Sequence, residues 1–245
     1  MPTYSTPPIT EAVIGINFTS PIDPELLLKL NQRFDSHYPH HQPLQNFNVK
    51  LAFGNSTDNS HPRIDTDSLV GHRRSSADMT QLVVFFPTML VVSQLAPYPG
   101  WTAFFNRFVR DWEIWKKVID FHRISRVGVR YINRIDIPVN DSLDYAQYLN
   151  LYPRLPIEIG SLSAYAVQTV SLIEDIGSKL TMNTAVIESP ILNHTSFLLD
   201  QDIAKEIDPP QRDEAIYALL GEIRNRKNAI FEACITERAR ELFND

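Results

Sequence analysis

The sequence predicts an α+β fold, in which a large, mostly antiparallel sheet carries helices on one face. Segments that alternate apolar and polar side chains outnumber segments with helical periodicity. Most neighbouring strand segments are joined by short, turn-like connections, such as residues 87–88 and 175–178. We therefore expect one globular domain over residues 1–245. This domain could consist of two similar β-α-β-rich halves, 1–140 and 141–245, although no internal repeat is visible.

The first part of the chain predicts a strand, a helix and a second strand. Residues 10–18 alternate apolar and polar side chains. Asp23 directly precedes Pro24, which is typical of a helix N-cap followed by a first-turn proline, and this helix should end before Pro39. Residues 46–53 form the second expected strand.

The middle of the chain predicts a loop, three strands and a long helix. Residues 54–68 are polar and turn-rich, and three antiparallel strands should follow between residues 69 and 95. Residues 99–121 have large apolar side chains at steps of three and four. These are Trp101, Phe104, Phe105, Phe108, Trp112, Trp115, Val118 and Ile119. Because each buried ring removes about 150–250 Å² from water, we expect core packing here in preference to a ligand site.

The second half predicts four more strands and terminal helices. The expected strands are residues 124–138, 163–174, 178–188 and 194–202. A linker at 142–160 contains a short helical segment. The terminal helices share an apolar stripe that includes Cys234, which we expect to be buried, and Thr236 is placed to cap a last short helix.

The strand RVGVRYINRIDIP, residues 126–138, carries three arginines. Alternation places Arg126, Arg130 and Arg134 on one face, together with Ile132, and the remaining Val, Tyr and Ile side chains on the other. Successive arginines should lie about 13 Å apart. Strands of this length usually bend or bulge, and Asn133 interrupts the apolar row. We therefore expect a bulge at Asn133, which would turn Arg134 to the opposite face and leave Arg126 and Arg130 as a pair.

Two interpretations of these arginines remain open. They could form ion pairs with carboxylates of neighbouring strands, such as Glu11, Asp200 or Asp202. Alternatively, they could form an anion-binding site, because guanidinium groups bind phosphate and carboxylate, and Gly128 would leave room for a ligand. The candidate ligand-binding residues are Arg126, Arg130, Arg134, Glu11 and Arg73. We favour the ion pairs, since they explain strand arginines without any ligand.

Catalytic and cofactor motifs are missing from the sequence. It contains no GxxxxGK[ST], GxGxxG, GxSxG or HExxH motif and no paired cysteines, so we expect no cofactor and no structural zinc. Asp200 and Asp202 would share a strand face and are weak candidates for a Mg²⁺ site. His37, His40 and His41 lie in a proline-containing segment that we expect to be an irregular surface loop.

Four segments together resemble a sporadically distributed bacterial family of unknown function. They are PPITEA (7–12), LAPYPGW (95–101), RVGVRYINRIDIP (126–138) and RNRKNAIFEACITERARELF (224–243). The family is marked by a PPIxEA first strand and an RVGxRYINRI strand motif. Val129 stands where this family more often has Leu, and Asn225 where it often has His. The resemblance implies no settled activity, and the family's scattered distribution is similar to that of defence or toxin–antitoxin genes.

Composition limits the function classes. The net charge of −6 and the pI of about 5.6 argue against general nucleic-acid binding. The single cysteine excludes an intrachain disulfide and fits a reducing compartment. No signal peptide is recognisable, and the most apolar window, residues 82–92, is too short to span a bilayer, so we expect a cytoplasmic protein.

These observations favour a non-catalytic cytoplasmic module that binds a protein partner, and a homo-oligomer is an equally open form of such a module. The evidence is the lack of a catalytic motif together with a large predicted sheet. The alternative is an enzyme or sensor that holds a phosphorylated small molecule through Arg126 and Arg130.

Overall fold

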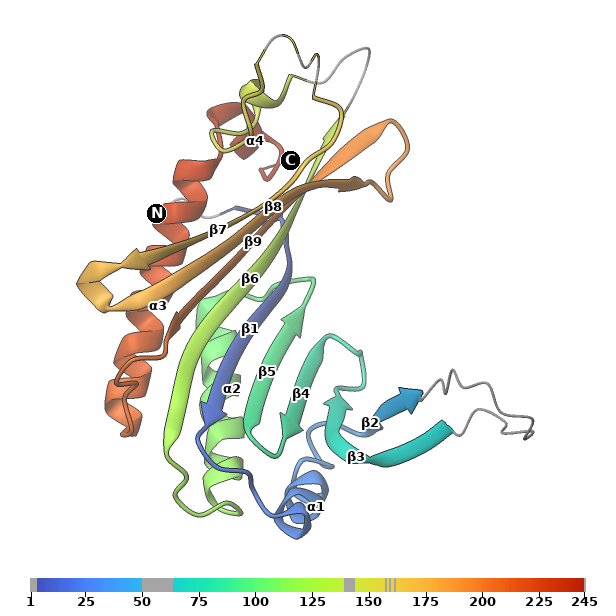
Figure 1. The fold of residues 1–245 in the computed structure, drawn as a ribbon, viewed down its shortest axis with the longest axis vertical. Helices are drawn as coiled ribbons and strands as arrows, with labels where there is room; N and C mark the ends of the chain where they lie inside the picture. The colour runs from blue at the N-terminus through green and yellow to red at the C-terminus, as the bar shows by residue number, and fades with distance from the viewer. Residues whose placement is uncertain are drawn as a thin grey trace, which may run out of the picture.

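The computed structural model describes residues 4–49, 64–138, 144–156, 158, 160 and 162–244. Within these residues the chain forms nine strands and four α-helices (Figure 1). The strands are β1 (Ile9–Phe18), β2 (His40–Val49), β3 (Ile64–Ser75), β4 (Gln81–Phe86), β5 (Met89–Leu95), β6 (Ile124–Pro138), β7 (Ala166–Ile173), β8 (Ser178–Glu188) and β9 (His194–Lys205). The helices are α1 (Pro24–Arg33), α2 (Trp101–Lys116), α3 (Asp213–Cys234) and α4 (Glu237–Glu241), with short 3₁₀ helices at Tyr145–Gln147 and Glu174–Ile176.

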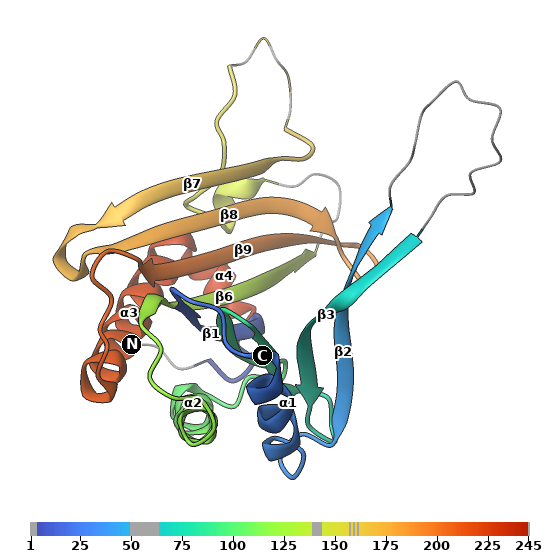
Figure 2. The same cartoon turned by 60° about the horizontal axis from the view of Figure 1, so that its bottom comes forward.

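All nine described strands belong to one open antiparallel sheet, in the order β2-β3-β4-β5-β1-β6-β9-β8-β7. The predicted fold class is therefore confirmed. The sheet is strongly curved, and Figure 2 shows α1, α2 and α3 side by side against one of its faces. The opposite face, called the open face below, has no helix packed on it in the described part of the chain. No helix among the described residues is long and apolar enough to cross a bilayer.

The hairpin of β2 and β3 is longer than the sequence predicts. β2 begins at His40, and β3 begins at Ile64, within the segment predicted to be a polar loop. His40 and His41 therefore lie on a strand, and their placement in an irregular loop is wrong. Ladder hydrogen bonds join backbone groups, so a strand can form without the side-chain alternation by which it is recognised. The predicted strand residues 50–53 and loop residues 54–63 lie outside the described residues.

Most other elements follow the prediction. β6 and β8 have the predicted bounds, and β9 continues to Lys205. The Asp23 side chain accepts a hydrogen bond from the Glu25 N–H at 2.8 Å and caps α1, as predicted. Thr236 accepts from the Ala239 N–H at 3.4 Å and caps α4. The linker before β7 holds only 3₁₀ turns among its described residues.

The core lies between the sheet and the helices. The aromatic face of α2 is buried as predicted, with Phe104 and Phe108 fully buried and Trp115 only 2% exposed. Val127, Val129 and other apolar residues of β6 form the sheet side of this core. Cys234 is also buried, as predicted, and burial raises the pKa of its thiol to about 11, which suits a packing residue.

The buried face of α2 also carries charge, which the sequence analysis did not predict. Arg107 and Asp111 are 7% and 0% exposed and lie one helical turn apart. Arg107 donates to the Ser93 carbonyl on β5 at 2.7 Å, and the Tyr38 hydroxyl donates to Asp111. Burial raises the pKa of both Tyr38 and Asp111. Because each buried group has a partner, this cluster fixes how α2 sits against β5 and the end of α1.

A second buried cation holds α3 against β6. Lys227 is 5% exposed, and its Nζ lies 3.8 Å from the centroid of the Tyr131 ring. The Tyr131 hydroxyl is 2.9 Å from the Tyr98 hydroxyl. Burial, with a smaller contribution from the positive charge of Arg224, lowers the pKa of Lys227 to about 7. The cation–π contact therefore joins a helix to the sheet through a group that titrates near neutral pH.

Replacing Lys227 by Met should flatten the pH dependence of stability between about pH 7 and about pH 9. Folding lowers the pKa of this amine from 10.5 to about 7, so the unfolded chain binds more protons in this range and the free energy of unfolding rises with pH. One such group adds a slope of at most about 1.4 kcal/mol per pH unit. Urea denaturation across this range measures the slope. The surface variant Lys117→Met should keep the slope of the unaltered protein. If Lys227→Met also kept this slope, the Lys227 amine would have to be protonated in the folded state over this pH range.

Candidate functional site

β6 is regular around Asn133, and its own irregularity lies near its start, where one extra residue stands opposite the step from Asn17 to Phe18 of β1. It pairs with β9 without any register shift, and Asn133 is buried and donates to the Leu199 carbonyl at 2.9 Å. The predicted bulge at Asn133 is therefore wrong. The irregularity next to Asn133 lies in the neighbouring strand β1, between Ile9 and Glu11. Because β1 absorbs the extra residue, Arg134 stays on the open face with the other two arginines.

The three arginines form a row of ion pairs on the open face, called the arginine ladder below. The pairs are Arg126–Asp202, Arg130–Asp200 and Arg134–Asp136. In the second pair, Nε and Nη2 of Arg130 lie 2.7 and 2.8 Å from the two carboxylate oxygens. In the first, Nη2 of Arg126 lies 2.7 Å from both oxygens of Asp202. The predicted pairing of strand arginines with Asp200 and Asp202 is confirmed.

Hydrogen bonds extend the pair of Arg130 and Asp200 across four strands. The Asp200 side chain is only 4% exposed and also accepts from the Asn183 amide on β8 at 3.0 Å. Asn183 in turn accepts from Gln168 on β7 at 2.7 Å. The hydrogen bonds to Asp200 raise the pKa of Arg130. Asp200 is thus a buried carboxylate that forms its ion pair with Arg130.

The space beside Gly128 is filled by the Arg126 guanidinium. A Cβ atom at Gly128 would lie 2.9 Å from Nη1 of Arg126 and 2.8 Å from the Cβ of Ala204. Gly15 on β1 pairs directly with Gly128, and a Cβ there would lie 3.6 Å from the same Nη1. Two facing glycines therefore form a trough in which the guanidinium lies. In the anion-binding interpretation this room is expected to admit a ligand, but the Arg126 side chain occupies it.

The structure brings most of the predicted binding residues together. Arg126, Arg130 and Glu11 line one depression on the open face, with a volume of about 480 Å³. Glu11 accepts a hydrogen bond from the Ser93 hydroxyl. Arg73 lies on β3, four strands away from β6, which is about 19 Å at the usual strand spacing. The depression therefore combines positive and negative groups, and Arg73 does not contribute to it.

No group of three His, Cys, Asp or Glu side chains is placed to hold a metal ion in the described part of the chain. Asp200 and Asp202 do share a face, as predicted, and each is engaged by an arginine. His41 Nε2 lies 3.0 Å from Nδ1 of His72, which is a hydrogen bond between two rings. Burial lowers the pKa of both histidines, so this pair stays neutral at neutral pH.

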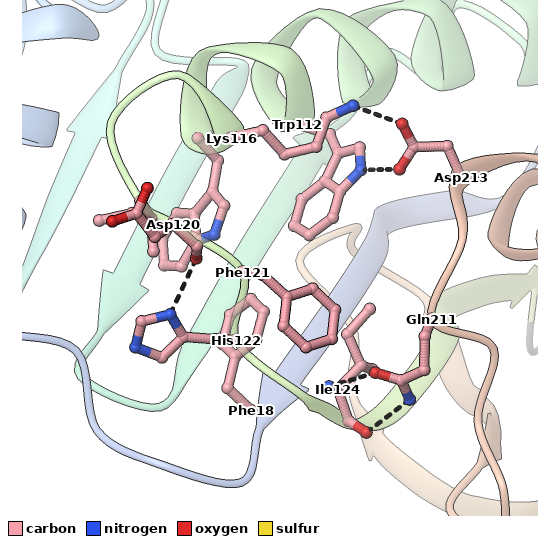
Figure 3. Close-up of a pocket in the computed structure, with 11 residues that line it drawn as sticks. Phe18, Trp112, Lys116, Asp120, Phe121, His122, Ile124, Gln211 and Asp213 are labelled. Carbon is pink, nitrogen blue, oxygen red and sulfur yellow. Dashed lines mark hydrogen bonds and ion pairs between the residues drawn. The ribbon is translucent and has the colours of Figure 1, made fainter.

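A second candidate site, which the sequence analysis did not predict, lies at the C-terminal end of α2 (Figure 3). We call it the aromatic pocket; its volume is about 300 Å³. Phe18 of β1 stacks on Trp115, with ring centroids 5.1 Å apart and an angle of 7° between the ring planes. The Phe18 ring also stacks with Trp112, and these two ring centroids are 6.4 Å apart. Phe121 is 78% exposed, and its ring projects between Trp112 and Ile124.

Polar groups at the pocket wall are already paired with one another. The Trp112 indole N–H donates to Asp213 at 2.9 Å, and Lys116 forms ion pairs with both Asp213 and Glu113. Burial alone would lower the pKa of Lys116, but the two carboxylates outweigh it and raise the pKa. The pocket therefore offers an aromatic surface whose single lysine charge is neutralised.

The position of Phe121 explains why the sequence did not reveal this pocket. The predicted helix extended to residue 121, whereas α2 ends at Lys116 and the next residues turn toward β6. Gln211 holds this turn by hydrogen bonds of 2.8 and 3.0 Å to both backbone groups of Ile124. The sequence contains only a weak signal, which is that Phe121 stands between two polar residues, Asp120 and His122, at the end of the apolar stripe.

No protein-family model matches the chain, and a search of curated proteins found no match. The resemblance to a bacterial family therefore stays a prediction, and the function has to be argued from the geometry.

Replacing Arg130 by Ala should lower the free energy of unfolding by about 2 kcal/mol, because the buried Asp200 carboxylate would lose two charge-assisted hydrogen bonds. Arg134→Ala is the matched control. Its partner Asp136 is a neighbour on the same strand, so the expected loss is below about 1 kcal/mol. Urea denaturation at neutral pH measures both free energies of unfolding. Equal losses in the two variants would contradict the idea that the burial of Asp200 makes its ion pair the more stabilising one.

Proposed function

We propose that this protein is a binding module that takes an apolar side chain of a partner protein into the aromatic pocket. The observation that carries the proposal is the exposure of Phe121, which is 78% exposed beside Phe18, Trp112 and Trp115, each at most 5% exposed. Exposed aromatic rings next to a preformed pocket are common anchors of protein interfaces. The stacked rings are held by the core, so the pocket needs little ordering when a partner binds.

The size and charge of the pocket favour a single side chain over a phosphorylated ligand. A volume of about 300 Å³ lies at the lower limit of small-molecule sites. Lys116 is the pocket's only lysine or arginine, and two carboxylates neutralise it. An anionic ligand would therefore meet Asp120 and Asp213 without a free cation among the described lining residues, whereas an apolar side chain can contact the exposed ring of Phe121.

The alternative, an enzyme or sensor that binds a phosphorylated small molecule through the arginine ladder, has less support. Arg126 and Arg130 each bind a carboxylate through short hydrogen bonds. A phosphate would have to displace Asp202 or Asp200 and leave a carboxylate unpaired in a partly buried place. The ladder thus suits a structural role better than ligand binding.

A second candidate function is self-association along β7, which forms one edge of the sheet. Its sequence, AVQTVSLI, contains no charged residue and no proline. Val167, Val170 and Leu172 are 38%, 61% and 65% exposed. Natural edge strands usually carry charges or prolines that prevent pairing with other chains. An antiparallel second copy of β7 would satisfy the free backbone groups without bringing like charges together.

Benzoylphenylalanine at position 121 should cross-link to a partner protein when cells of the native host are irradiated. The photoreactive ring would replace the exposed ring of Phe121 and lie where the partner side chain enters. The matched control carries the same group at Met79, which is 47% exposed in the turn between β4 and its neighbour β3. Gel electrophoresis should show a band of higher mass for position 121 and not for position 79.

The same partner should be lost from a pull-down with Phe121→Ser. The melting temperature of this variant should stay within a few degrees of the unaltered protein, because substitutions of exposed residues usually change stability by less than about 0.5 kcal/mol. Identical bands from both cross-linking positions would contradict the proposal. So would a partner that Phe121→Ser retains in full.

Val170→Lys should abolish self-association along β7, because a lysine on each copy would place like charges across the new strand pair. Sedimentation velocity at increasing protein concentration measures the change. The control Leu192→Lys adds the same charge at a residue 90% exposed between β8 and β9, and should associate like the unaltered protein. A protein that stays monomeric without any substitution would rule out this second candidate.

A further inference from the structure

A basic depression lies next to the aromatic pocket, between α1 and the end of α2. It has a volume of about 490 Å³. Its lining residues are Leu26, Lys29, Gln32, Arg33, Lys117 and Val118. We call this surface the basic depression. The described residues that line it include three cations and no acidic side chain.

The three cations of the basic depression are not neutralised by the described part of the chain. Lys29, Arg33 and Lys117 are all exposed, and none lies within 4 Å of a carboxylate of a described residue. Arg126 and Arg130, by contrast, are paired on the open face. In a chain with a net charge of −6, this is a local positive surface that attracts negative groups.

Helix geometry explains why two of the three cations can lie there without a carboxylate partner. α1 ends at Arg33 and α2 ends at Lys116, with Lys117 as the C-cap residue. The unpaired carbonyl groups at a helix C-terminus carry a partial negative charge that stabilises nearby cations. Arg33 and Lys117 are stabilised in this way without a carboxylate partner, whereas Lys29 lies one turn before the end of α1 and is simply exposed to solvent.

The two depressions lie on either side of the same turn. Trp115 and Ile119 line the aromatic pocket, whereas Lys117 and Val118 line the basic depression. The distance between them is therefore close to the width of one helix, about 10–12 Å. An extended peptide rises about 3.3 Å per residue and covers this distance in three to four residues. A single partner segment can reach both surfaces.

We propose that the partner is an acidic segment that places one large apolar side chain in the aromatic pocket and carboxylates, three to four residues away, on the basic depression. This inference rests on the proposed function and adds the chemistry of the partner. Charge complementarity carries it: Lys29, Arg33 and Lys117 supply free positive charge, and the neighbouring pocket supplies neutral ring surface. A polyanion such as nucleic acid would bring no apolar side chain for the pocket and would meet the negative charge of the whole protein.

Fluorescence anisotropy with designed peptides tests this inference. The probe is a fluorescein-labelled peptide of twelve residues with one central Phe and glutamates three and four residues away on both sides. The control peptide has glutamine at these positions. The glutamate peptide should bind about ten-fold more tightly at low ionic strength, and most of this difference should disappear at about 0.3 M NaCl.

Two matched variants locate the charge effect. The double variant with Lys29→Gln and Lys117→Gln should lose most of the preference for the glutamate peptide. It should bind the glutamine peptide as the unaltered protein does. Arg154→Gln with Lys179→Gln removes two exposed cations elsewhere and should keep the preference. A preference for glutamate that survives the first pair of substitutions would overturn the assignment to the basic depression.

The remaining outcomes separate this inference from the function on which it rests. Equal binding of both peptides, lost in Phe121→Ser, would overturn the acidic partner and leave the proposed function intact. Binding of neither peptide would count against both. Displacement of the glutamate peptide by a single-stranded oligonucleotide, with a Kd below that of the peptide, would assign the basic depression to nucleic acid instead.

Discussion

The alternation of side chains along β6 is the constraint on which the rest of the structure depends. This strand is hydrogen-bonded to β1 on one edge and to β9 on the other, so it joins the N-terminal and C-terminal parts of the sheet. Most of its apolar residues, such as Val127, Val129 and Tyr131, face the helices, and its arginines face the open side. A shift of one residue would move every guanidinium into the core. The carboxylates of β9 oppose such a shift, because their pairs with Arg126 and Arg130 form only in this register.

Polar contacts then decide how the helices dock on this sheet. Arg107 and Asp111 connect α2 to β5 and to Tyr38, and Lys227 of α3 lies over the Tyr131 ring of β6. Such buried groups are costly unless their partners are in place, so they disfavour other arrangements of the helices. With apolar packing alone, many positions of the helices on the sheet would have similar energy. The polar contacts can form in only a few of these positions.

The distribution of charge differs between the open face and the side of the helices, where we propose that a partner binds. On the open face, the arginine ladder is neutralised by the carboxylates beside it and contributes to the sheet. Around the end of α2, rings are exposed at Phe121 and cations are free in the basic depression. Interfaces form where the surface offers unsatisfied apolar area and uncompensated charge, and here both occur on the side of the helices.

The sequence by itself determined the α+β class, the bounds of β6 and β8 and the helix caps, and it favoured ion pairs between strand arginines and carboxylates such as Asp200 and Asp202. These features depend on local periodicity or on the residue types that neighbours must supply. Only the tertiary structure decided that β1 absorbs the register shift and keeps Arg134 on the open face, because a shift can occur in either of two paired strands. Tertiary contacts also ended α2 at Lys116 and brought α1 beside it, which placed Phe121 and the three free cations around one turn. Such positions arise from contacts between distant segments, and no local pattern encodes them.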